Sequence, residues 1–250
     1  YRIFILALGT LVVETIVAVT HIAFRLLDVA MAVVNGAASR LAMPRLSALQ
    51  HDRIALAEAY GDLTQLQALV GLPIAAGLAI TAPQLVTLLM GGPWIAAAAP
   101  AQLVALAAIP TFLVGPASAL WLAVGRTRIN LVVQLVAFSV PLTALLVVRP
   151  VDAAGAALCW AGGSLAVPPI QLALGLRALG RPVRWLAARL MVPVIGTAGM
   201  AAAAILMARH VEQTEPLTAL LLITCVGGIV YLTILALLLG GRMPRALREA

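Results

Sequence analysis

Lysine is absent from this chain of 250 residues, and sixteen arginines supply all of its positive side chains apart from histidine. Because a Walker A loop contacts the β/γ-phosphates through a lysine, the sequence excludes an ATP site of that type. Cysteine and histidine are also scarce, and Cys159 and Cys225 lie far apart in apolar runs. We therefore predict no disulfide framework, no metal site, no cofactor and no catalytic residues.

Charged residues are few as well, at 10% of the chain, whereas hydrophobic residues make up 63% and the mean hydropathy is +1.10. A soluble domain needs far more polar surface, so the composition predicts an all-α, polytopic bundle of transmembrane helices. The first apolar run, at about 1–11, is too short to span a membrane, and we expect it to be a truncated helix. Seven complete spans are expected to follow, at about 12–39, 63–90, 101–124, 129–148, 153–176, 190–208 and 217–239.

Residues 40–62 are expected to form a cytoplasmic interfacial loop, and Pro44 is expected to end the span before it. The apolar residues of 45–62 recur at helical spacing among charged ones, which favours a helix at the membrane surface. If this loop is cytoplasmic and the spans alternate, twelve arginines fall inside and only Arg149 and Arg209 fall outside, as the positive-inside rule requires. The tail after residue 240 is then also cytoplasmic.

The span at 12–39 carries an unusual polar stripe, formed by Glu14, His21, Arg25, Asp28 and Asn35. On an ideal helix these five residues fall within roughly a quarter of the circumference. A central Arg or Asp costs about 2.5–3.5 kcal/mol to insert, whereas each large aliphatic residue returns only about 0.3–0.6 kcal/mol. The stripe must therefore face other helices or a water-filled cavity.

Two interpretations of this stripe remain open. It is either a polar seam that lines a transport path, with Arg25 as the contact for an anion, or an i, i+3 pair of Arg25 and Asp28 that joins helices. Eight of the fifteen prolines lie within the predicted spans, where each removes a backbone hydrogen bond. They are expected either to bend the helices of a transporter or to reflect the ordinary frequency of proline in membrane helices.

Five segments, in order, carry a resemblance to a known family: 22–28 (IAFRLLD), 43–52 (MPRLSALQHD), 71–73 (GLP), 89–94 (LMGGPW) and 125–126 (GR). Together they resemble the polysaccharide (O-antigen, exopolysaccharide) flippases of the multidrug/oligosaccharidyl-lipid/polysaccharide exporter superfamily. From 150 onward only the pattern of spans agrees. The resemblance implies that 1–250 is the C-terminal lobe of a two-lobe exporter in the bacterial inner membrane, without its N-terminal lobe.

The resemblance also implies a function, which is translocation of an undecaprenyl-pyrophosphate-linked oligosaccharide by alternating access in a secondary transporter that is not an enzyme. In this reading Arg25, His21 and Asn35 contact the substrate, and Asp28 and Glu14 hold Arg25 or couple transport to an ion gradient. The expected partners are the lipid-linked oligosaccharide, membrane lipids and other polysaccharide-assembly proteins. Nucleic acid is not expected, because the basic residues are spread along one membrane face.

Three alternatives stay open. A lipid II flippase belongs to the same superfamily, as does a cation-coupled multidrug exporter. Aromatic residues at 4% and a net charge of +7 count against an exporter of organic cations. A membrane-embedded glycosyl transferase or polymerase would need a large outward loop, and the longest outward connections predicted here are only about ten residues.

Overall fold

The computed structural model describes residues 2–211 and 213–239, except for the side chains of residues 33, 35 and 37–40. Within these ranges the chain forms helices and no strands, which confirms the predicted all-α class. The helices are α1 (Arg2–Gly9), α2 (Glu14–Ala48), α3 (Arg53–Met90), the 3-10 helix η1 (Gly92–Ala97), α4 (Ala98–Val114), α5 (Ala117–Ala123), α6 (Thr127–Val148), α7 (Ala153–Leu179), α8 (Val183–His210) and α9 (Pro216–Leu239). The predicted cytoplasmic tail after residue 240 lies outside the described residues.

The helices are long and apolar enough for seven membrane crossings, when η1, α4 and α5 are taken together as one crossing. The predicted number of spans is therefore confirmed. The borders agree closely for the fifth span, expected at 153–176 and found at Ala153–Leu179, and for the last, expected at 217–239 and found at Pro216–Leu239. The sixth span, expected at 190–208, is longer than predicted, because the basic residues before 190 already belong to α8.

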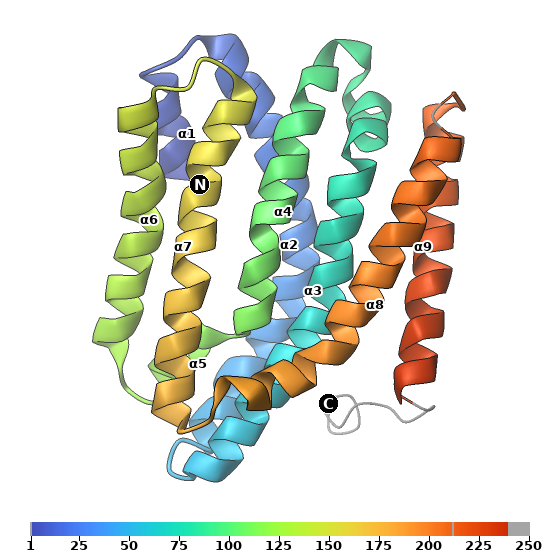
Figure 1. The fold of residues 1–250 in the computed structure, drawn as a ribbon. Coiled ribbons are helices and arrows are strands. Elements are labelled where there is room, and N and C mark those ends of the chain that lie inside the picture. The colour runs from blue at the N-terminus through green and yellow to red at the C-terminus, as the bar shows by residue number, and fades with distance from the viewer. Residues whose placement is uncertain (1, 212, 240–250) are drawn as a thin grey trace.

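Helix α3 lies in the middle of the bundle and packs against α2 and α4, and also against α8 and α9 (Figure 1). Helix α7 packs on α4 and α6, and the short α1 lies against α2 and α6. The largest buried cluster joins most of these helices and includes Phe24, Leu72 and Phe112. The α2–α3 turn, the α5–α6 turn and the α7–α8 connection lie together at one end of the bundle, here called the α2–α3 end.

The prediction that Pro44 ends the second helix is wrong, because α2 continues through Pro44 to Ala48. A proline removes one helical hydrogen bond, but packing can compensate for that loss. Ala42 and Leu46, on either side of Pro44, are fully buried in a cluster with residues of α3, α5 and α7. The 40–62 segment is consequently the two ends of α2 and α3 joined by a turn at 49–52, and not a separate interfacial helix; its side of the membrane remains a prediction.

A second proline, Pro73, leaves a carbonyl of α3 without its helical donor. In a regular α-helix the Leu69 carbonyl would accept a hydrogen bond from the backbone N–H of residue 73, which proline lacks. The hydroxyl of Tyr231 on α9 donates to that carbonyl instead, at 2.6 Å. The contact satisfies the backbone carbonyl that Pro73 leaves without a donor, which a membrane helix requires because lipid offers no hydrogen bonds. It also fixes α9 against α3.

Charged side chains join α8 to α3 at the α2–α3 end. The Glu58 carboxylate accepts hydrogen bonds from the guanidinium groups of Arg181, at 2.9 Å, and Arg189. Both guanidinium groups also lie over the Trp185 ring, at 5.4 and 4.1 Å from its centre. Gly61 allows this approach, since a Cβ there would lie 2.7 Å from the ring of Trp185. The α7–α8 connection is therefore held onto the first turns of α3.

Candidate substrate cavity

The span predicted at 101–124 is broken between α4 and α5. Gly115 has φ 69° and ψ −157°, a conformation that is essentially restricted to glycine, and Pro116 follows it. A Cβ on Gly115 would lie 2.1 Å from Oγ1 of Thr64 on α3, so the backbone approaches α3 more closely than any other residue type would permit. The Tyr60 hydroxyl donates to the carbonyl of Val114, the last residue of α4. Helix α3 thus packs directly against the break, and its Tyr60 satisfies the carbonyl at the end of α4.

A cavity of about 570 Å³ lies at this break, between α2, α3, α4, α5, α6 and α7. We call it the break cavity. Its polar lining comes from six uncharged side chains: Gln67, Thr111, Ser118, Gln134, Ser164 and Gln171. No charged side chain is among the described residues that line it. A second cavity of about 510 Å³ shares Gln134, Ala137 and Trp160 with the break cavity and continues along α6 and α7 toward Arg2 on α1.

Gln67 is the most informative of these side chains. It is only 7% exposed, and its Oε1 has no hydrogen-bond partner in the part of the chain that the structure describes. A buried amide oxygen without a partner costs about 1–3 kcal/mol, so a native site with such a group calls for an explanation, such as a ligand or water. Gln134 is partly satisfied, since its Nε2 donates to Ser118 Oγ at a long 3.4 Å.

Trp160 supplies the only aromatic ring among the residues that line the break cavity. It is held from α2 by Phe24, whose ring meets it edge to face with centroids 5.1 Å apart. Amides and hydroxyls can each donate and accept hydrogen bonds, and an indole offers an apolar face beside them. This set suits an uncharged ligand rich in hydroxyl groups better than an ion. No side chain of the lining set is a ready general acid or base, so the arrangement favours binding over proton transfer.

The predicted polar stripe lies elsewhere. Glu14, His21 and Arg25 are exposed and Asp28 is half-buried, on the face of α2 opposite the buried Ala23, Phe24 and Leu27. None of them lines a cavity described above. The Asn35 side chain lies outside the described residues. Within the described part, no ion pair joins Arg25 to Asp28, so the interpretation of the stripe as a neutralised pair has no support.

The glutamines of the break cavity were not among the predicted site residues. The signal in the sequence was present but weak: Gln67, Gln134 and Gln171 each interrupt an otherwise apolar run. An uncharged amide in a span is often a contact between helices, so one glutamine alone predicts no site. Only the packing of α3, α6 and α7 brings the three together. No three His, Cys, Asp or Glu side chains within the described ranges are grouped as metal ligands.

Comparison with known proteins gives a match for the N-terminal part of the chain. A family described as polysaccharide biosynthesis protein matches residues 2–99, which hold α1, α2, α3 and η1 and the first four of the five segments that carry the resemblance. No curated protein and no solved structure gives a significant match. The seven long apolar helices make the chain a multi-pass membrane protein. Residues 2–99, less than half of the chain, are similar to the polysaccharide biosynthesis family, which supports the resemblance to polysaccharide flippases.

Proposed function

We propose that the protein moves a lipid-linked oligosaccharide across the bacterial inner membrane, and that its sugar units pass through the break cavity. The observation that carries this proposal is an uncharged polar cavity inside an apolar bundle, with the unpartnered Gln67 in its wall. Sugar hydroxyls cannot cross about 30 Å of hydrocarbon without losing their hydrogen bonds. Amide and hydroxyl side chains can donate and accept hydrogen bonds in place of the water that the sugar hydroxyls leave behind.

The break between α4 and α5 suits a site that opens and closes. Transporters commonly build their substrate sites around interrupted helices, because a break allows one segment to move against the rest. Ser118 and Leu122 of the seven-residue α5 line the cavity, so a movement of α5 would change its shape. Helix α5 also leads directly into α6, which supplies Gln134.

The stripe on α2 has a separate role in this proposal. Exposed Glu14, His21 and Arg25 could not face lipid without an insertion cost of several kcal/mol, about 2.5–3.5 for Arg25 alone. We infer that this face of α2 borders an aqueous lumen, where Arg25 contacts the diphosphate and Asp28 or Glu14 couples transport to an ion gradient. Arg25→Ala should then abolish polymer export and Arg25→Lys should restore it only partly, because lysine lacks the bidentate geometry of a guanidinium group.

The break cavity is tested by Gln67→Leu in the intact protein, with export of polymer and the amount of protein in the membrane measured in the same cells. Leucine is similar in size but cannot form hydrogen bonds, so export per inserted protein should fall by about tenfold or more, the equivalent of roughly 1.4 kcal/mol. Gln102→Leu is the matched control, since Gln102 on α4 lines none of the cavities described here. Normal export from Gln67→Leu at normal protein levels would refute the proposal.

A further inference from the structure

A third cavity, of about 480 Å³, lies at the α2–α3 end and is lined by the arginines Arg53, Arg126 and Arg177, among other residues. We call it the arginine cavity. No carboxylate is among the described residues that line it. Arg126 and Arg177 have no ion pair within the described part of the chain. The Arg53 side chain donates one long hydrogen bond, of 3.4 Å, to the carbonyl of Arg177. Three exposed guanidinium groups around one cavity, without an acid among the described lining residues, suit a multiply charged anion.

Two further features of this cavity fit an anion. Trp121 is fully buried in its wall, and the indole Nε1–H has no hydrogen-bond acceptor among the described residues. Helix α6 begins here at Thr127 without a side-chain cap. The Ile129 N–H donates to the Arg126 carbonyl, whereas the N–H groups of Thr127 and Arg128, and the positive end of the helix dipole, remain available. The nearby end of α7 would oppose an anion, but two of its carbonyls already accept hydrogen bonds: that of Leu176 from Arg181, and that of Arg177 from Gly180 and Arg53.

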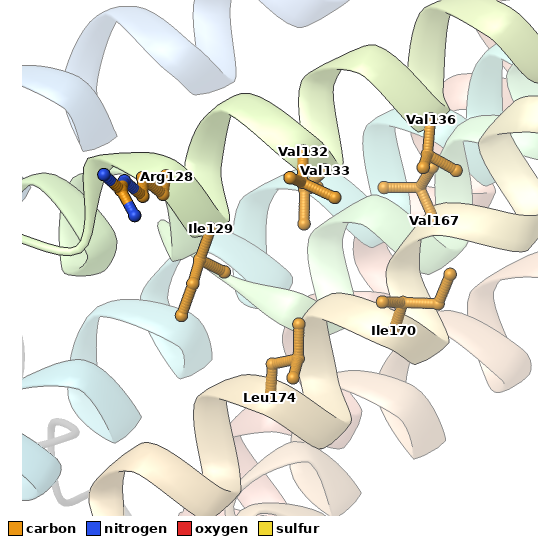
Figure 2. A pocket seen from close by; sticks show the side chains of 8 residues that line it. All are labelled: Arg128, Ile129, Val132, Val133, Val136, Val167, Ile170 and Leu174. Carbon is orange, nitrogen blue, oxygen red and sulfur yellow. The ribbon is translucent and has the colours of Figure 1, made fainter.

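An apolar groove of about 250 Å³ between α6 and α7 starts at this cavity. The two share Ile129 and Leu174. Figure 2 shows the side chains of α6 and α7 facing one another along the groove, with Arg128 at one end of the row. Apart from Arg128, every residue that lines the groove is aliphatic: Ile129, Val132, Val133, Val136, Val167, Ile170 and Leu174.

We propose that the arginine cavity and the α6–α7 groove together form a binding site for a lipid that carries a diphosphate on a single hydrocarbon chain. The diphosphate would lie among Arg53, Arg126 and Arg177, with the start of the chain between α6 and α7. This inference rests on the proposed function and adds to it a place for the lipid end of the substrate. That place is distinct from the break cavity and from the stripe on α2, so the diphosphate would meet the arginine cavity and Arg25 at different stages of transport.

Charge and volume both favour this occupant over a membrane phospholipid. A phosphodiester headgroup brings one negative charge, whereas a diphosphate brings at least two to the three arginines. The groove is smaller than the range of about 300–1,000 Å³ that is typical of sites for whole drug-sized ligands, and it suits a stretch of one chain rather than two. The groove also shares Val167 with the break cavity, so sugars attached to the same lipid could reach Gln67 and Gln171.

The site is tested by binding of farnesyl diphosphate to the purified chain in detergent micelles, with inorganic diphosphate and phosphatidylglycerol as comparison probes. Farnesyl diphosphate should bind about tenfold or more tightly than inorganic diphosphate, since each buried CH₂ adds about 0.8 kcal/mol and tenfold corresponds to about 1.4. Phosphatidylglycerol at the same concentration should displace little of it. Equal displacement by phosphatidylglycerol, or no saturable binding of farnesyl diphosphate, would overturn the proposal.

Two sets of variants, each with its own control, separate binding of the diphosphate head from binding of the hydrocarbon tail. Arg126→Gln and Arg177→Gln should each weaken binding of both diphosphates by about tenfold, the loss expected for a hydrogen bond to a charged group. Arg184→Gln, at the same end but outside the cavity, should not weaken binding. Ile170→Trp should fill the groove and weaken binding of farnesyl diphosphate alone, whereas Leu165→Trp, similarly exposed on α7 but outside the groove, should not. A control variant that weakens binding as much as the cavity or groove variants of its set would refute the site.

The outcome can be told apart from that of the function test. If Gln67→Leu leaves export intact but the Arg126 and Ile170 variants lose binding, the lipid site stands and sugar passage through the break cavity does not. If the Gln67 variant loses export while Arg126→Gln binds farnesyl diphosphate as tightly as wild type, the lipid site is wrong and the proposed function stands.

Discussion

The hydrogen bond from Tyr231 to the Leu69 carbonyl yields a prediction whose size can be worked out from the structure. Tyr231→Phe keeps the ring, which packs beside Gly196, and removes only the hydroxyl. Because Pro73 cannot donate, the Leu69 carbonyl then has no partner in a buried position. Hydrogen bonds between membrane helices contribute about 0.6 kcal/mol on average and up to about 1.7. With no backbone donor to take over, we expect a loss near the upper end, at about 1–2 kcal/mol.

The assay is a double-mutant cycle with Pro73→Ala, measured by unfolding of the micellar protein in increasing SDS and followed by circular dichroism. Alanine at this position returns an N–H to the Leu69 carbonyl, so Tyr231→Phe should cost much less in the Pro73→Ala background. Thr233→Val is a control on the same helix. Thr233 also donates to a carbonyl, that of Ile229 at 2.7 Å, but this carbonyl keeps its ordinary helical donor. We expect Thr233→Val to cost little.

A Tyr231→Phe cost that is the same in both backgrounds would refute the reasoning. The hydroxyl would then contribute by some route other than replacing the donor that Pro73 lacks.

The remaining predictions concern two further contacts with α3, at Gly115 and at Glu58. Gly115→Ala should lower the unfolding free energy by more than the roughly 1–3 kcal/mol of backbone strain, because the new Cβ would overlap Thr64. Gly125→Ala, also at positive φ but with no atom within 4 Å of the new Cβ, should cost only about 1–2 kcal/mol, and equal losses from the two variants would contradict this. Glu58→Gln should lower the unfolding free energy by no more than about 1 kcal/mol, since the carboxylate is 42% exposed, and the loss should shrink in 1 M salt. Glu215→Gln, an exposed acid that makes no ion pair in the described ranges, is its control, and a loss that does not depend on salt would rule out the electrostatic explanation.

The spans could be predicted from the sequence because hydropathy acts locally and over a length set by the membrane. The apolar run at 217–239 became α9 almost without change. Pro44 shows where local reasoning fails. The missing hydrogen bond is visible in the sequence, but the burial of Ala42 and Leu46 against α3, α5 and α7 is not. The same holds for the break cavity, whose glutamines lie 37 or more positions apart and meet only after α3, α6 and α7 have packed.

The polar stripe on α2 and the break cavity differ in a way that follows from the cost of burial. A charge within the bundle would need a partner at close range, since an isolated ion in a medium of low dielectric costs far more than the partner-free amide of Gln67. Accordingly, Arg25, His21 and Glu14 lie on the exposed face of α2, the ion pairs of Glu58 lie at one end, and the interior polar groups are neutral. A neutral cavity has a further consequence for transport. Its empty and filled states can be close in free energy, because about 1–3 kcal/mol per unpartnered group is small enough to be gained on binding and given back on release. A cavity lined by buried charges, unlike the arginine cavity with its exposed Arg53, Arg126 and Arg177, would hold its ligand, or collapse onto its own ion pairs, more strongly than a carrier can tolerate.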